Sequence, residues 1–360
     1  MKHLEQNKLI NDSQHGFTKG KSCATNLIQF FDKATEAVDR GSPVDIFYLD
    51  FAKAFDKVPH ERLLEKVKSK GVGTKLLGWL RDWLTDRKQR VTCEGNLSEE
   101  CTVESGVPQG TVLGPPLFNI FIDDIDDEAS LINLLLKFAD DTKGMKEIHN
   151  EEDAKQLQTT LDKLFGWSNK WGMKFNIDKC KIMHLGRNNP ENIYTMGGKE
   201  LVSVEEEKDV GVTIHKSLKP GRQCKRAAGT AMGVLRQIHH NFHFRDRHVF
   251  VKLYKQYVRP HLEFGTPAWN PWQKGDIDLL ESVQEKAVKM VSGLKGTTYE
   301  ERCQEIGLEP LVTRRANQDI IQTYKIVKKI DKLDPDRIFP FKNQTHNTRS
   351  TADKYKINIP

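Results

Sequence analysis

Two adjacent aspartates, Asp140 and Asp141, are the residues of this chain best placed to do chemistry. They follow an apolar run over residues 131–136 that is typical of a strand. Neighbouring side chains of a strand point to opposite faces, so two adjacent carboxylates act together only where the backbone turns. We therefore expect a tight hairpin at this pair. Two like charges there are costly without a cation, which predicts a divalent metal and a third carboxylate.

Asp50 is the candidate for the third carboxylate. It ends an apolar and aromatic run, residues 44–49, that predicts a buried strand. Asp50, Asp140 and Asp141 together offer the hard oxygen ligands that Mg²⁺ prefers, with Mn²⁺ as a substitute. Two such ions would hold the attacking and leaving oxygens of a phosphoryl transfer.

Other aspartates of the chain have simpler interpretations. An Asp-Asp pair is most often a solvated turn, and this remains the alternative for Asp140-Asp141. The pairs Asp123-Asp124 and Asp126-Asp127 alternate with isoleucine like an amphipathic helix end, so we predict that they lie on the surface. Asp45 and Asp56 are interpreted as structural or solvated.

Five segments follow one another along the chain: Tyr48–Asp56, Ser105–Pro115, Phe138–Asp141, Asn176–Lys181 and Asp209–Ile214. In this order they resemble the motifs of reverse transcriptases. Further segments downstream, Tyr257–Gly265, Trp269–Pro271 and Arg314-Arg315, are similar to non-LTR retrotransposon polymerases of the jockey and chicken-repeat kind. The resemblance covers almost the whole chain and implies an α+β right-hand polymerase with partial fingers, a palm with an antiparallel sheet, and a helical thumb. In chain order, the five segments resemble motifs A, B, C, D and E of the family.

The resemblance implies roles for several residues. Asp50, Asp140 and Asp141 would bind two Mg²⁺ ions together with the main-chain carbonyl of Phe51. Phe55 would lie under the incoming sugar, where a bulky ring excludes a ribose 2′-hydroxyl; ordinary core packing is its alternative.

Further residues would contact the substrates. Gln109 and Gly110 would contact the nascent base pair and the template, with a tight turn before a proline-started helix as the alternative. Lys179 would act on the leaving pyrophosphate, although most lysines are simply solvated. Lys19 and Lys21 are candidates for contact with the triphosphate.

A basic segment follows the motifs. Residues 222–259 hold nine Lys or Arg and a single acid, whereas the whole chain has a net charge of only +6. Leu235, Ile238, Phe242, Val249, Leu253 and Tyr257 recur at helical spacing, which predicts basic helices with one apolar face. Such helices suit a nucleic-acid backbone, although a charged helix face is often only solvated. The predicted duplex contacts are Arg222, Lys225, Arg226 and Arg236.

The expected organisation follows from the resemblance and the apolar patterns. We predict partial fingers over 1–43, a palm with finger insertions over 44–216, a thumb over 217–300 and a C-terminal extension over 301–360, with a partly disordered tail from about residue 334. The predicted helices are 24–40, 61–69, 74–86, 113–125 and 151–171, with a hairpin at 89–104 and strands at 173–185 and 208–214.

The resemblance implies an RNA-directed DNA polymerase that uses an RNA template, a DNA primer and deoxynucleoside triphosphates. The upstream endonuclease and first fingers motifs of this family are absent, so we expect a truncated fragment; an inactive remnant that binds RNA or DNA is the alternative. A maturase is a third hypothesis, which the downstream segments disfavour. Six cysteines without paired spacing, no signal peptide and no membrane-spanning run indicate a nuclear and cytoplasmic protein without membrane contact.

Overall fold

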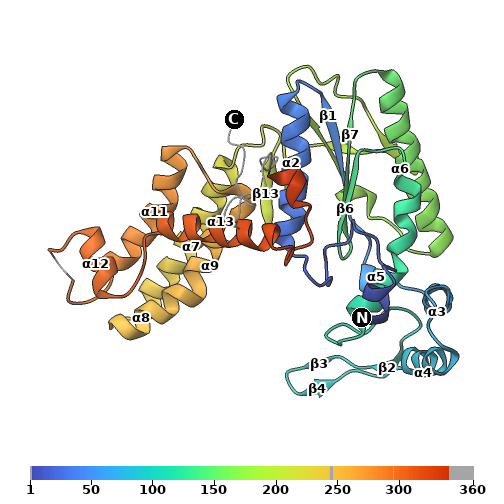
Figure 1. The fold of residues 1–360 in the computed structure, drawn as a ribbon. Helices are drawn as coiled ribbons and strands as arrows, with labels where there is room; N and C mark the ends of the chain where they lie inside the picture. Colours follow the sequence, from blue (N-terminus) through green and yellow to red (C-terminus); the bar gives the residue numbers. More distant parts are fainter. Residues whose placement is uncertain (1, 244–245, 295, 340–360) are drawn as a thin grey trace, which may run out of the picture. The chain divides into compact units, whose positions relative to one another are not determined.

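The computed structural model describes residues 2–243, 246–294 and 296–339 (Figure 1). The chain forms two compact units. Unit 1 contains the residues up to Ser22 together with Lys33–Glu205, and unit 2 contains Cys23–Asp32 together with the described residues from Glu206 onward. Helix α2 (Cys23–Asp39) is divided between them. The four-part organisation expected from the sequence stays a prediction.

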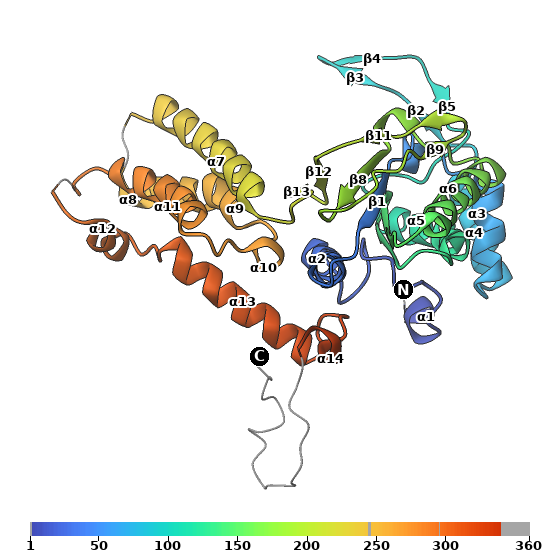
Figure 2. The same ribbon diagram turned by 90° about the horizontal axis from the view of Figure 1, so that it is seen from above.

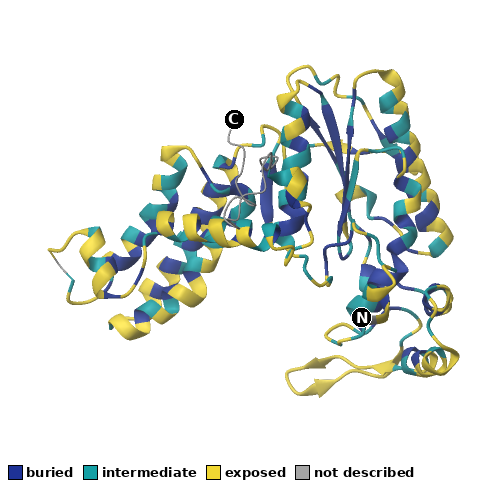
Figure 3. Cartoon of the chain, in the orientation of Figure 1, coloured by how far each residue is buried: buried dark blue, intermediate teal, exposed yellow. Residues whose placement is uncertain are grey.

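A five-stranded sheet is the centre of unit 1, in the order β11-β8-β1-β7-β6. All six residues of the central strand β1 are buried (Figure 3). Its neighbours β7 and β8 both pair with it in antiparallel orientation, and only the β11–β8 pair is parallel. The strands are β1 (Val44–Leu49), β6 (Leu134–Phe138), β7 (Asp141–Glu147), β8 (Lys181–Leu185) and β11 (Val202–Ser203).

Helix α6 (Glu151–Trp171) covers one face of this sheet and has the bounds that the sequence predicts (Figure 1). Asn150 closes its first turn with a capping box, and Gly172 ends it in the left-handed conformation. Leu157, Leu161 and Leu164 are fully buried against the sheet. These leucines are therefore part of the core.

The remaining elements of unit 1 include the helix of motif B and the hairpin predicted over 89–104. The strands β2 to β5 form two short antiparallel ladders whose residues are all exposed (Figure 3). Small elements after β8 complete the unit. The elements are α1 (Lys2–Gln6), η1 (Ala54–Asp56), α3 (His60–Ser69), α4 (Thr74–Leu84), β2 (Lys88–Gln89), β3 (Thr92–Cys93), β4 (Asn96–Leu97), β5 (Cys101–Thr102), α5 (Gly114–Phe121), η2 (Asp123–Ala129), η3 (Ile177–Lys179), β9 (Thr195–Met196) and β10 (Lys199–Glu200).

Two expectations for unit 1 are wrong in detail. The acidic pairs after α5 form the 3₁₀ helix η2, and Asp123 is buried rather than on the surface. Lysines from other elements neutralise this cluster, with Lys70 paired to Asp123 at 2.5 Å. The predicted strand over 173–185 is interrupted, because the 3₁₀ turn η3 separates a bridge at Phe175 from β8.

Unit 2 is mainly helical after a short hairpin. Helices α7 and α11 lie side by side, and α7 also contacts α9 (Figures 1 and 2). The elements are β12 (Glu206–Asp209), β13 (Val212–His215), α7 (Gly221–Asn241), α8 (Arg247–Leu253), the π-helix η4 (Tyr254–Val258), α9 (Arg259–Glu263), α10 (Thr266–Trp269), α11 (Lys274–Lys289), α12 (Tyr299–Glu305), α13 (Leu311–Val327) and α14 (Pro335–Ile338).

The predicted apolar face of the basic segment is right in α7 and wrong beyond it. Leu235 and Ile238 are buried, but Val249 and Tyr257 are exposed. Phe250, Tyr254 and Val258 are buried in their place, at the same spacing but one residue later. Phe242, also predicted to face inward, is exposed as well.

Two general expectations concern the whole chain. Among the described residues, no helix is both long enough and apolar enough to cross a bilayer. All six cysteines lie in the described ranges, and none of them forms a disulfide there. Of the tail predicted to be partly disordered, residues 335–338 form α14, and residues 340–360 lie outside the described residues.

Candidate active site

The register of the sheet brings Asp50 next to the aspartate hairpin. Strands β6 and β7 pair up to Phe138 and Asp141, so only Ala139 and Asp140 form the loop. Strand β1 pairs with β7 up to Leu49 opposite Thr142, and the next pair in this register is Asp50 with Asp141. Residues directly opposite in an antiparallel pair have Cα atoms about 4.5–5.5 Å apart and side chains on the same face. The expected tight hairpin is therefore present, with Asp50 beside it.

The hairpin turn holds its backbone in an uncommon conformation. Ala139 has a φ of 55°, in the left-handed region that L-residues avoid. A positive φ at the first residue of a two-residue loop is the pattern of a type II′ turn, which matches the twist of the strands. Burial first, and the nearby charge of Asp50 after it, raise the pKa of Asp140. The two carboxylates therefore interact electrostatically.

Asp50 is incompletely satisfied by the protein. Its Oδ2 is buried and makes no hydrogen bond, although the Lys179 Nζ lies 3.3 Å away as an ion-pair partner outside hydrogen-bond geometry. Within residues 2–243, 246–294 and 296–339, no three acidic, His or Cys side chains are already gathered as a metal cluster. An unsatisfied carboxylate oxygen beside a second carboxylate of raised pKa still fits a hard divalent cation by charge and ligand type.

The backbone after Asp50 is fixed on one side only. Asp50 accepts a hydrogen bond from the Asn176 N–H at 2.8 Å, and the Ala52 N–H donates to Lys174 at 2.9 Å. Phe51 lies between them in a bridge with Phe175, so its own N–H and C=O point to the opposite side of the strand. That side is the one on which β7 and the hairpin lie. The role of the Phe51 carbonyl as a metal ligand stays a prediction.

Phe55 has a partly buried position in an aromatic group. Its ring stacks on Phe118 of α5 with centroids 4.4 Å apart, and Phe17 approaches at 6.5 Å in an edge-to-face arrangement. Core packing thus supports one face of the ring. The side chain is only half-buried.

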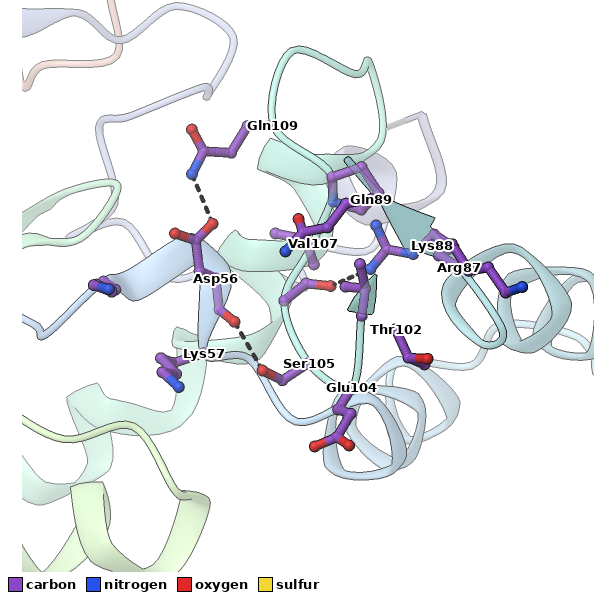
Figure 4. A pocket seen from close by; sticks show the side chains of 14 residues that line it. Asp56, Lys57, Arg87, Lys88, Gln89, Thr102, Glu104, Ser105, Val107 and Gln109 are labelled. Atoms are coloured by element: carbon purple, nitrogen blue, oxygen red, sulfur yellow. Dashed lines mark hydrogen bonds between the residues drawn. The ribbon is translucent and has the colours of Figure 1, made fainter. Parts of the chain in front are cut away.

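The motif B loop contacts Asp56, the last residue of motif A. Gln109 donates a hydrogen bond to an Asp56 carboxylate oxygen at 2.9 Å, and the Ser105 hydroxyl donates to the Asp56 carbonyl at 2.8 Å (Figure 4). Gly106 has a φ of 94°, and a Cβ there would collide with the Asp56 backbone. Glycine is required at this close approach.

A cavity of about 740 Å³ opens beside this loop, with Gln109 and Asp56 in its wall (Figure 4). Arg87 supports the wall, because its guanidinium donates to the carbonyls of Leu84 and Gly106. Burial lowers the pKa of Arg87. The cavity carries four basic and two acidic residues: Lys53, Lys57, Arg87, Lys88, Asp56 and Glu104.

The other expected contact residues have different surroundings. Lys19 is exposed, whereas the Lys21 ammonium binds the carbonyl and carboxylate of Asp12. Gly110, with a φ of 74°, has open space around it. The four residues predicted to contact the duplex are all exposed on α7 of unit 2: Arg222, Lys225, Arg226 and Arg236.

Sequence reasoning missed two polar residues of this region. Asp56, interpreted as structural or solvated, holds Gln109. Gln14 is buried, and its amide contacts Ala139 of the hairpin turn. Each contact joins residues that are distant in sequence, so no local pattern could reveal either one.

The α+β sheet with its carboxylate-bearing hairpin, and the helical unit that follows it, define a right-hand polymerase. The sequence model of the family described as reverse transcriptase (RNA-dependent DNA polymerase) matches residues 1–224. The chain belongs to this family. Members of the family generally depend on divalent metal ions.

Two curated relatives are polymerases of Drosophila mobile elements. The chain is 28% identical over 305 residues to the RNA-directed DNA polymerase from mobile element jockey of Drosophila funebris, covering 80% of this chain and 33% of the relative. It is 26% identical over 315 residues to the probable RNA-directed DNA polymerase from transposon BS of Drosophila melanogaster, covering 82% and 34%. The chain thus spans about a third of the length of the curated relatives it matches. The apo telomerase structure from Candida tropicalis shares 15% identity at a TM-score of 0.47, covering 92% of this chain and 52% of that one.

Proposed function

We propose that this chain is the polymerase part of a non-LTR retrotransposon reverse transcriptase. The reaction is the template-directed addition of deoxynucleoside triphosphates to a DNA 3′-hydroxyl, with RNA as the template. One observation supports the proposal most: the β1–β7 ladder ends at the Leu49–Thr142 pair, so Asp50 and Asp141 are the next residues on the two strands. The protein would carry out this reaction in the nucleus and cytoplasm.

The residues at the hairpin have distinct parts in this reaction. Asp50, Asp140, Asp141 and the Phe51 carbonyl would hold two Mg²⁺ ions, or Mn²⁺, which when bound stabilise the charge of the attacking and leaving oxygens. Lys179 would neutralise or protonate the departing pyrophosphate. Its exposed ammonium already lies beside Asp50, at the same edge of the sheet.

The template and the sugar would be read beside the same edge. Gln109 and Gly110 would contact the template and the nascent base pair, and the cavity beside them has room for a template nucleotide. Lys19 would contact the triphosphate; Lys21 could do so only after leaving Asp12. Arg222, Lys225, Arg226 and Arg236 of α7 would bind the phosphate backbone of the duplex, with a salt-dependent affinity.

Phe55, supported by Phe118, would exclude a ribose 2′-hydroxyl. Phe55→Ala should raise incorporation of ribonucleotides relative to deoxynucleotides by at least about tenfold, because removing a steric clash changes selectivity directly. Competition between the two nucleotide types in single-nucleotide addition measures this. An unchanged preference would remove the role of Phe55.

Primer extension tests the main proposal. A DNA primer on an oligonucleotide RNA template, with deoxynucleotides and Mg²⁺, should be extended by the wild type and not by Asp140→Ala. Asp127→Ala is the matched control, because Asp127 is an exposed aspartate of the same unit outside the hairpin. Equal and null signals from the wild type and Asp140→Ala would contradict polymerase activity. Retained binding of the RNA–DNA duplex would then identify a binding module.

A further inference from the structure

The N-terminal segment forms an additional edge of the sheet beside β6. Residue Gln14 makes a parallel bridge with Lys137. The His15 N–H donates to the Lys137 carbonyl at 2.8 Å, and the Lys137 N–H donates to the Ser13 carbonyl at 2.8 Å. The segment therefore runs alongside the strand that leads into the aspartate hairpin.

The Gln14 side chain grips the hairpin turn itself. Its Oε1 accepts a hydrogen bond from the Ala139 N–H at 3.0 Å, and its Nε2 approaches the Ala139 carbonyl at 3.5 Å. The first group belongs to the peptide before Ala139 and the second to the peptide that leads to Asp140. One amide thus holds both peptide planes on either side of Ala139. Its contacts restrain both backbone dihedral angles of that residue.

This grip acts where the backbone is strained. A positive φ is unfavourable for alanine because of its Cβ, so the turn needs support from its surroundings. Gln14 is only 1% exposed, so water does not compete strongly for its hydrogen bonds. A buried amide with both ends occupied is a suitable support.

Neighbouring residues hold Gln14 in place. The Gly16 N–H donates to the same Gln14 Oε1 at 2.8 Å. A Cβ on Gly16 would collide with the Ala139 backbone nitrogen, so only glycine allows this approach. The buried Asn119 of α5 donates to the Gly16 carbonyl at 2.8 Å. The segment is thus fixed to the helix after motif B and to the hairpin together.

We propose that Gln14 is a positioning residue that sets the place of the Asp140 carboxylate through the Ala139 backbone. It touches no substrate in this role. The inference rests on the proposed polymerase function, because a carboxylate that takes part in chemistry must be held within fractions of an ångström. The contact with Ala139 has a readout that does not depend on catalysis.

Gln14→Met tests the grip, because methionine has a similar length and shape but neither donates nor accepts these hydrogen bonds. We expect hydrogen exchange of the Ala139 amide to accelerate at least about tenfold, because it loses its acceptor. We expect kcat for single-nucleotide addition to fall about 10- to 100-fold, as a displaced catalytic group does. The KM for nucleotide and the Kd for primer–template should change less than about twofold.

Asn11→Ala is the matched control. Asn11 lies in the same segment, and its side chain donates to the Asp123 carbonyl at 2.9 Å, without contact to the hairpin. General loosening of the segment would give the same changes in both variants. A specific grip gives them in Gln14→Met alone. Gln14→Asn, which keeps the amide but is one methylene too short, should repeat the Gln14→Met result if methionine prevents folding.

The outcomes separate this inference from the proposed function. A wild type that extends the primer, with kcat and Ala139 exchange unchanged in Gln14→Met, would overturn the inference and leave the polymerase supported. Equal effects in Asn11→Ala would also overturn it. An inactive wild type, with faster Ala139 exchange in Gln14→Met, would overturn the polymerase proposal and leave the grip on the turn supported.

Discussion

An aspartate lies at each end of strand β1, Asp45 within the strand and Asp50 directly after its last residue, and the two have opposite surroundings. Asp45 is completely buried and fully partnered. Its carboxylate contacts the His184 Nδ1 at 2.7 Å and accepts hydrogen bonds from Asn189 at 2.8 Å and Tyr194 at 2.6 Å. Burial, and then the charge of Asp45, raise the pKa of Tyr194, which keeps its hydroxyl a donor.

Asp50, at the other end, is partly exposed and has a buried oxygen without a hydrogen bond. Hydrogen-bond donors do not fully neutralise the charge of Asp50. This charge adds to the effect of burial and raises the pKa of Asp140 further. A buried carboxylate that is saturated with donors serves the fold, whereas one left unsatisfied beside another carboxylate is typical of a functional site. We therefore expect Asp45 to contribute to stability and Asp50 to contribute to the reaction.

The largest expected effect is on activity, in Asp50→Asn. This isosteric change removes a charge that we propose binds metal, so we expect kcat for nucleotide addition to fall about 10³-fold or more. It also removes the like charge beside Asp140, so the free energy of unfolding should stay equal or rise slightly. Single-nucleotide addition and urea unfolding measure the two quantities. Retained activity, or a large loss of stability, would break the contrast between Asp50 and Asp45.

Asp45→Asn should show the opposite pattern. Removing one charge from a buried, hydrogen-bonded group leaves His184 and Tyr194 poorly matched, which costs about 3–5 kcal/mol of folding free energy. The folded fraction should keep its kcat, because Asp45 lies at the far end of the strand from the hairpin. Tyr194→Phe, which loses one donor, should cost only about 1 kcal/mol. Urea midpoints and active-fraction-corrected rates check both expectations.

Lys66 is a buried cation that can be compared with the buried carboxylate of Asp45. It has partners, as Asp45 does: the Asp124 carboxylate at 2.6 Å, the Phe121 carbonyl at 2.5 Å and the Trp171 ring centroid at 3.7 Å. Burial nevertheless lowers the pKa of Lys66 from 10.5 to about 8. Partners are therefore not sufficient to offset the loss of water.

The sign of the resulting pH dependence is fixed. Between pH 8 and 10.5 the unfolded state binds more protons at Lys66 than the folded state, so stability from this group rises with pH. The full change is about 3 kcal/mol. The unfolding free energy of the wild type minus that of Lys66→Met should therefore increase from pH 7.5 to pH 10. A constant difference would mean that the partners hold the pKa of Lys66 near its ordinary value.

Local pattern was sufficient for the parts of the site that single segments define. The strand ending at Asp50, the hairpin at Asp140-Asp141 and helix α6 follow from periodicity and turn chemistry over short stretches. Motif order then indicated the family. The assigned roles of individual residues remain predictions that the experiments above address.

Contacts across long sequence separations could not be predicted in this way. Asp123 has the composition of a surface turn, and its burial is explained by partners distant in sequence: the Lys70 ammonium and the Asn11 N–H. In the basic segment, Val249 and Tyr257 share their spacing with Phe250 and Tyr254, so periodicity allowed two phases. Packing against other elements of unit 2 selected the second phase. Sequence pattern fixes spacing, but not which of two apolar faces turns inward.

Lys179→Ala should give the smallest effect and tests how Asp50 is balanced. The Lys179 side chain is 68% exposed, so its ion pair with Asp50 adds less than about 1 kcal/mol to stability. We expect kcat to fall about tenfold, because the positive charge that we propose acts on the leaving group is lost. Lys179→Arg separates two roles: arginine keeps the charge but does not give up a proton. Restored kcat in Lys179→Arg would identify charge neutralisation, whereas a loss equal to that of alanine would identify proton donation. An unchanged kcat in Lys179→Ala would show that Asp50 needs no cation from the protein, which is the strongest form of its contrast with Asp45.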